Sequence, residues 1–204
     1  MKRASKKSWL CASLLAVPLA CVSCGVSSQQ VSSKETSIAP AASTIPAEYQ
    51  SAIQNVLGAE TDILAYGDLS KTGTTEVLGA NRLKAGPTAT SPGTLVTRVS
   101  ILEKTAGAWR EIFRCDDHLH NPNGFLADTP LAPVSGWRLQ YERDESKGLE
   151  MYFTPIAKPA GGNFITIGVR WNPKVNRYQS LDKTFKQFLG EQSLLEIPEA
   201  RARL

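Results

Sequence analysis

The chain has 204 residues, of which 42% are hydrophobic and 21% are charged, and its formal net charge is +4. This length suits one ordinary domain with a single hydrophobic core. Four of the 23 basic residues lie among the first seven positions, so 19 basic residues face 19 acidic residues in the remainder. A balanced chain without a basic cluster gives no electrostatic basis for binding nucleic acid, and we exclude that class of partner.

Residues 1–20 predict an export signal. The segment opens with four basic residues, Lys2, Arg3, Lys6 and Lys7. Residues 9–20 then carry no charge and are mostly apolar. Because a helix needs about 20 apolar residues to cross the hydrocarbon of a bilayer, this run is too short for a stable span. A basic start, a short apolar run and small residues before a break are typical of a secretory signal.

Two closely spaced cysteines, Cys21 and Cys24, follow the apolar run, each with a small residue directly before it. The segment resembles a bacterial lipoprotein signal, in which Leu, a small residue, Gly or Ala, and then Cys follow one another. Pro18 occupies the Leu position of the pattern that ends at Cys21, and Cys21 occupies the Leu position of the pattern that ends at Cys24. The resemblance implies a lipid on Cys21, with Cys24 as the second choice, and therefore a membrane-anchored envelope protein. Without the lipid, the same signal implies a secreted or periplasmic soluble protein.

Residues 21–44 are rich in Ser and Ala, contain no aromatic residue and show no periodicity, so they predict a flexible tether. A single domain is expected over residues 45–190, followed by a weakly ordered tail at 191–204. The cysteines are too few for a disulfide framework. If Cys21 carries lipid, an oxidising compartment permits a bridge between Cys24 and Cys115. The alternative is that Cys115 is a small buried apolar residue.

The hydrophobic pattern predicts an α+β domain that is mainly antiparallel β. Apolar residues at spacings of three and four indicate a helix over 46–57. About eight strands in hairpin succession are expected at 62–66, 76–83, 95–103, 109–115, 137–142, 149–154, 164–171 and 177–180. A second short helix at 182–189 would bury Phe185, Phe188 and Leu189, with Gly190 closing it. One N-terminal and one C-terminal helix would therefore flank the strands.

The stretch 67–77 combines acids, hydroxyls and glycines in the order GDLSKTGTTEV. It is similar to one loop of the FG-GAP or VCBS-type extracellular repeats, in which an acid-rich calcium turn joins two strands. Asp68, Gly73 and Glu76 match the acid, the glycine and the closing acid of that pattern. Ser70 and Thr72 replace the middle acids, whereas calcium takes six to eight oxygen ligands, several of them charged. The resemblance therefore implies a glycine-dependent hairpin that has lost the ion.

Both histidines of the chain lie in one short segment, together with Asp116 and Asp117. On an extended backbone, residues i and i+2 face the same side, so Asp116, His118 and His120 would converge. Their side chains suit zinc or another divalent ion. No fourth ligand is identifiable, and the turn residues 121–124 favour a polar loop that leaves a strand.

The remaining motifs give no catalytic signature. The chain contains neither a Gly-x-Ser-x-Gly elbow nor a phosphate-binding glycine-rich loop. Six aromatic residues at strand positions suit core packing or, alternatively, an exposed ligand platform: Trp109, Trp137, Tyr141, Phe153, Trp171 and Tyr178. We therefore expect a non-catalytic binding or scaffolding domain without a cofactor, whose partner is an envelope protein or a glycan. The alternative is a metal-dependent envelope enzyme that uses Asp116, His118 and His120.

Overall fold

The computed structural model describes residues 45–83, 93–127, 129, 133–156 and 165–192. All of them belong to one compact unit, Ser43–Leu204. The predicted signal, both candidate lipidation cysteines and the tether lie outside the described residues. Within the described ranges, no helix is both long enough and apolar enough to cross a membrane.

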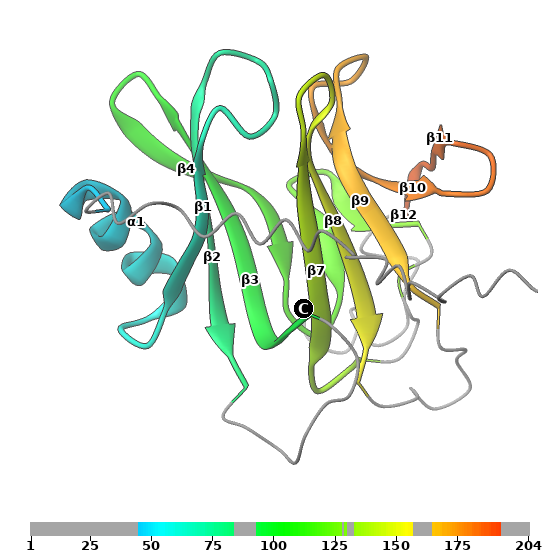
Figure 1. Ribbon diagram of the computed structural model, residues 1–204, viewed down its shortest axis with the longest axis horizontal. Helices are drawn as coiled ribbons and strands as arrows, with labels where there is room; N and C mark the ends of the chain where they lie inside the picture. The colour runs from blue at the N-terminus through cyan, green and yellow to red at the C-terminus, as the bar shows by residue number, and fades with distance from the viewer. Residues whose placement is uncertain (1–44, 84–92, 128, 130–132, 157–164, 193–204) are drawn as a thin grey trace, which may run out of the picture. The chain divides into compact units, whose positions relative to one another are not determined.

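The described residues form one helix, α1 (Ala47–Leu57), and one antiparallel sheet of twelve strands that curls into a half-barrel (Figure 1). The strands are β1 (Asp62–Gly67), β2 (Thr75–Arg82), β3 (Thr94–Thr105), β4 (Ala108–Cys115), β5 (Leu119–Asn121), β6 (Gly124–Leu126), β7 (Trp137–Asp144), β8 (Gly148–Pro155), β9 (Ile167–Asn172), β10 (Arg177–Asp182), β11 (Gln187–Phe188) and β12 (Glu191–Gln192).

Strand β3 is the point at which the sheet divides. One edge of β3 pairs with β2 along almost its whole length. The other edge pairs first with β7, at residues 94–96, and then with β4, from Val99 to Thr105. Two branches therefore leave the same edge of one strand. One branch continues as β4-β5-β6-β12 and the other as β7-β8-β9-β10-β11.

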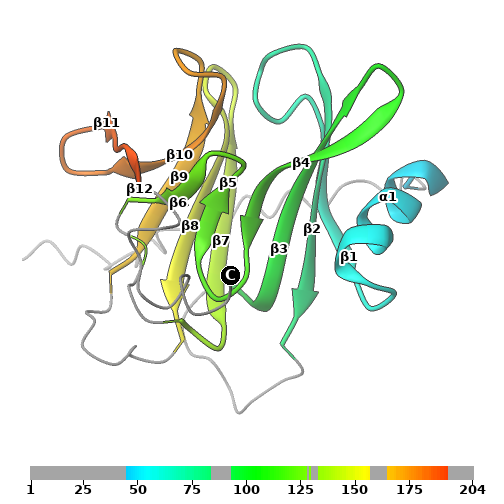
Figure 2. The same cartoon turned by 180° about the vertical axis from the view of Figure 1, so that it is seen from behind.

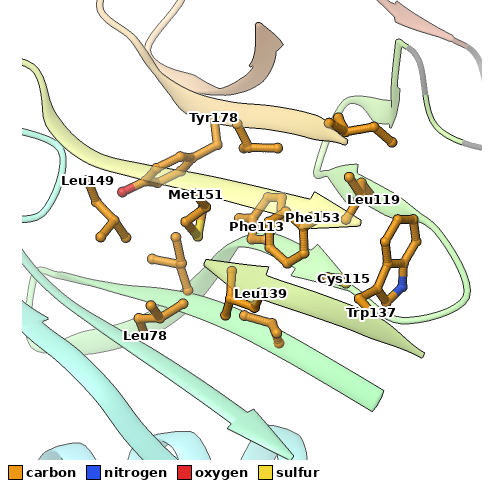
Figure 3. Close-up of a cluster of buried hydrophobic side chains, with 14 of the residues drawn as sticks. Leu78, Phe113, Cys115, Leu119, Trp137, Leu139, Leu149, Met151, Phe153 and Tyr178 are labelled. Carbon is orange, nitrogen blue, oxygen red and sulfur yellow. The ribbon is translucent and has the colours of Figure 1, made fainter. Parts of the chain in front are cut away.

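The main core lies between these branches and is built from large side chains. Figure 3 shows Trp137 at one end of the cluster and the hydroxyl of Tyr178 at the other, on the side of Leu149. The ring centroids of Phe113 and Phe153 are 5.6 Å apart, and those of Phe113 and Tyr178 are 6.0 Å apart. All four rings are fully buried, so the chain's own side chains fill the space that the curled sheet surrounds.

A polar network joins the ends of the two branches. The amide group of Asn121 on β5 donates to the carbonyl oxygen of Tyr178 on β10 over 2.7 Å and to Glu191 on β12 over 3.0 Å. The carboxylate of Glu191 also accepts hydrogen bonds from Arg177 and Gln179 at 2.6 and 2.7 Å. The first two residues of the predicted tail form β12. Residues 193–204 lie outside the described residues.

Helix α1 covers the outer face of β2 and β3 with a second, smaller cluster (Figure 2). Ile53 is its central residue and is completely buried. A Cβ atom added to Gly79 on β2 would lie 2.1 Å from the Cγ1 atom of Ile53. Glycine at this position therefore allows the helix to approach the sheet closely.

The predicted N-terminal helix and the eight predicted strands are confirmed, with boundaries that differ by a few residues. The start of the seventh predicted strand, at residue 164, lies outside the described residues, and β9 begins at Ile167. The prediction missed four strands of two or three residues, β5, β6, β11 and β12.

The predicted C-terminal helix is wrong, because residues 182–189 form a hairpin between β10 and β11. The carboxylate of Asp182 accepts hydrogen bonds from the backbone N–H groups of Thr184 and Phe185 at 2.8 and 3.3 Å, which fixes a turn. Lys186 then takes a φ of 53°, outside the helical region. Leu181 pairs with Phe188 across the hairpin, and Phe185 is 69% exposed instead of buried.

Candidate functional site

The histidine segment forms a tight turn rather than an extended strand. The backbone N–H of Asp116 donates to the carbonyl oxygen of His118 over 3.0 Å, and the N–H of His118 donates to the Asp116 carboxylate over 3.2 Å. Trp137 also donates from its indole nitrogen to the carbonyl oxygen of Asp116 over 2.6 Å. Because the chain reverses here, Asp116 and His118 do not have the i and i+2 relationship of a strand.

The structure brings together two of the three predicted metal ligands. Nε2 of His120 lies 3.3 Å from Oδ2 of Asp116. His118 is buried, and its ring centroid lies 4.9 Å from that of Phe125. Burial raises the pKa of Asp116, but the hydrogen bond and the charge of His120 and the His118 amide outweigh burial and lower this pKa to about 2. In the part of the chain that the structure describes, no group of three or more His, Cys, Asp or Glu residues is arranged to hold a metal ion.

Cys115, which precedes this turn, is a free and fully buried thiol. Burial raises its pKa well above the usual value, and the nearby Asp116 acts in the same direction. A thiol in this state is a poor nucleophile, because the thiolate is the reactive form. Cys115 therefore behaves as a small core residue, and the predicted bridge partner Cys24 lies outside the described residues.

Four of the six aromatic residues are buried in the core, which agrees with the packing role rather than with the alternative of an exposed platform. Trp137, Phe153 and Tyr178 are completely buried, and Trp171 is nearly so. Tyr141 is the exception at 39% exposed, and its hydroxyl donates to the carbonyl oxygen of Leu64 over 3.2 Å. Trp109 is half-buried beside α1, with its ring centroid 5.7 Å from that of Tyr49.

The loop between β1 and β2, residues 68–74, is closed by its own hydrogen bonds. The backbone N–H of Thr72 donates to the Asp68 carboxylate over 3.0 Å. The hydroxyls of Ser70, Thr72 and Thr74 form a chain with two oxygen–oxygen distances of 2.8 Å. Gly73 has a φ of 80°, which glycine adopts without strain. The oxygens of this turn therefore bond to one another and to the backbone.

Glu76, at the base of this loop, is a buried acidic residue. It is 0% exposed. Its Oε2 atom lies 2.7 Å from the backbone N–H donor of Ser70 and 3.4 Å from the hydroxyl of Tyr178, whereas Oε1 has no hydrogen-bond partner. Burial, together with the negative charges of Glu103 and Asp68, raises the pKa of Glu76 to about 7, and the hydrogen bonds of Ser70 act in the opposite direction. Burial and the charge of Glu76 likewise raise the pKa of Tyr178 well above its usual value.

Sequence reasoning placed Glu76 in the loop motif but did not find its burial or its contact with Tyr178. One signal was present, because Glu76 alternates with Leu78 and Ala80, which both belong to the main core. The network around Asn121 and Glu191 gave no comparable signal, since these two residues lie on β5 and β12, which have only three and two residues and show no period.

Comparison of the chain with protein-family models, with curated proteins and with solved structures gave no match.

Proposed function

We propose that this chain is an exported, lipid-anchored protein of the cell envelope, whose half-barrel domain binds or scaffolds a partner without catalysing a reaction. The N-terminal segment supports export and lipid anchoring, since its basic start, short apolar run and paired cysteines resemble a lipoprotein signal. The balanced charge of the remaining chain supports attachment through lipid rather than through a basic surface.

The main observation behind the binding role is that side chains of the chain itself fill the interior of the half-barrel. Phe113, Trp137, Phe153 and Tyr178 fill the space inside the curled sheet. A partner would therefore contact the outer surface. The histidine segment supports a role without catalysis. His118 packs against Phe125, and the Asp116 carboxylate is held by His118 and His120.

The outer face of β8 and β9 is the surface that we favour for this partner. The hydroxyl of Tyr152 donates to Glu150 over 2.8 Å, and Arg170 forms an ion pair with the same carboxylate. The ammonium group of Lys183 lies 3.5 Å from the centroid of the Tyr152 ring. Side chains held in this way lose less conformational freedom on binding, which favours recognition of a polar partner such as an envelope protein or a glycan.

Lipid anchoring is tested by replacing both candidate cysteines, Cys21→Ala with Cys24→Ala, and by fractionating the producing cells. We expect the double variant to lose incorporated fatty-acid label and to accumulate as an unprocessed or soluble form. Cys11→Ala, inside the apolar run, is the matched control and should remain in the membrane fraction. Normal membrane-bound mature protein in the double variant would contradict the anchor.

The non-catalytic role is tested by elemental analysis of the purified full chain. We expect no stoichiometric transition metal in the wild type. If one metal ion per chain is found and is lost in His118→Ala with His120→Ala, the metal-dependent enzyme replaces the binding domain as the better proposal.

A further inference from the structure

The β1–β2 loop closes one end of the main core by inserting a single side chain. Leu69 is 1% exposed and packs with the core cluster. The loop lies beside the β7–β8 turn in both views (Figures 1 and 2), and the backbone N–H of Leu149 donates to the carbonyl oxygen of Leu69 over 2.7 Å. A Cβ atom at Gly148 would lie 2.2 Å from that oxygen, so the two turns approach as closely as glycine allows.

Glu76 joins this loop to the opposite side of the core. Its carboxyl accepts the hydrogen bond of the Ser70 N–H from the loop and lies beside the hydroxyl of Tyr178 on β10. Figure 3 shows that hydroxyl at the Leu149 end of the core cluster. One buried carboxyl therefore contacts both the loop and a strand that is 102 residues away in sequence.

Burial and the neighbouring charges favour the neutral form of Glu76 and outweigh the hydrogen bond from Ser70, which favours the ionised form. Glu103 lies directly opposite on β3, and the charge of Asp68 in the loop also acts on Glu76, so both neighbouring charges are negative. The nearest basic residue in the register, Arg110, forms its ion pair with Glu103 at 2.8 Å. Neither hydrogen bond to Glu76 comes from a cationic group, and Oε1 has no partner. An ionised carboxylate is strongly disfavoured in such a place, whereas a protonated carboxyl is tolerated.

We propose that Glu76 makes closure of this end of the core depend on pH: the protonated carboxyl keeps Leu69 inserted, and deprotonation releases the β1–β2 loop. The loop is the element that moves, because β2 is held by β1 and β3 on both edges, whereas the loop contacts the opposite branch through the Leu149 N–H. Release lets water reach Oε1. The raised pKa of about 7 places this change near neutral pH. The inference does not depend on the proposed binding role.

Hydrogen exchange of two amides tests this proposal directly. Release of the β1–β2 loop would break the hydrogen bonds that the N–H groups of Ser70 and Leu149 donate. Protection factors of the full chain would be measured at about pH 5.5 and about pH 8.5, corrected for the intrinsic pH dependence of exchange. With a Glu76 pKa near 7 when the loop is closed and 4.5 when it is released, protection should fall about 30-fold at the higher pH. The amide of Phe153, in the β8–β9 ladder, should keep its protection.

Glu76→Gln should show equal protection of Ser70 and Leu149 at both pH values. Glu145→Gln, an exposed acid in the adjacent β7–β8 turn, is the matched control and should behave as the wild type. The proposal is overturned by wild-type protection that does not change with pH, or by an equal loss in Glu76→Gln. It is also overturned if added CaCl2 restores protection at the higher pH in the wild type alone, since a cation would then control the loop.

A second measurement needs no variant. The carbon-13 shift of the Glu76 carboxyl in the wild-type chain reports its own titration. We expect its midpoint to coincide with the loss of protection at Leu149. Midpoints that differ by more than about one pH unit would show that another group controls the loop.

Discussion

Glu76 and Glu103 lie directly opposite each other on β2 and β3, yet their surroundings differ in charge. Glu103 accepts hydrogen bonds from the guanidinium group of Arg110 at 2.8 Å and from Thr105 at 3.1 Å. Glu76 accepts only from the uncharged groups of Ser70 and Tyr178. Like charges opposite each other destabilise a sheet, so the pair is best accommodated when Glu76 is neutral.

The free energy of unfolding should therefore fall as the pH rises. The pKa of Glu76 is about 7 in the folded chain and near 4.5 when unfolded, so its stabilising effect is complete below 4.5 and is lost as the pH rises through 7. The total loss is about 3 kcal/mol for a shift of this size. Glu76→Gln should remove this fall, so that the variant is more stable than the wild type at about pH 8. Urea unfolding at several pH values measures the free energy of unfolding of both proteins. An unchanged pH dependence in the variant would contradict the assignment of this fall to Glu76.

Gly79→Ala should separate helix α1 from the sheet. The new methyl group would lie 2.1 Å from Cγ1 of the buried Ile53, so either the helix or the strand must shift. Overpacking of this kind costs about 1–3 kcal/mol, which chemical denaturation would measure. Gly190→Ala is the control, because a methyl group there meets nothing within 4 Å. Equal stability of the two variants would show that the packing of α1 on β2 is looser than described.

Asn121→Ala should weaken the junction between the two branches of the sheet. Its amide group donates to the Tyr178 carbonyl oxygen and to Glu191, and its oxygen accepts from the N–H of Asn123 over 2.8 Å. Removing a buried side chain with three such bonds costs about 1–3 kcal/mol. Asn123→Ala, in the same turn but exposed, should change the free energy of unfolding by less than about 0.5 kcal/mol. Similar losses in both variants would contradict a role for the network.

Much of the sheet could be predicted from sequence because its longer strands alternate in polarity. In β7, Trp137 and Leu139 face the core while Arg138 and Gln140 do not, and this alternation identifies the strand directly. Strands of two or three residues, such as β12, are too short to show a period. They exist because a partner pairs with them, as Leu126 does with Glu191.

The candidate site was less accessible to sequence reasoning, because burial of a charged group depends on distant residues. Tyr178 is 102 residues from Glu76 in sequence, and the two side chains meet through the tertiary structure alone. In the histidine segment, the sequence predicted a contact correctly but not the backbone that makes it. Asp116 and His120 do meet, but a turn replaced the extended backbone that the prediction required, and His118 packs on Phe125 instead.

The expected helix and the observed hairpin at residues 182–189 assign different roles to two phenylalanines. In a helix, Phe185 and Phe188 would both be buried. In the hairpin, Phe185 is 69% exposed, whereas Phe188 is half-buried under the guanidinium group of Arg170, 5.0 Å from its ring centroid.

Phe185→Ala should therefore change the free energy of unfolding by less than about 0.5 kcal/mol, as exposed substitutions do. Phe188→Ala should cost about 1 kcal/mol or more, since it removes both partly buried apolar surface and the contact with Arg170. Urea unfolding of both variants compares them directly. A helix would instead make the two losses similar and large, because each ring would then leave a cavity in the core.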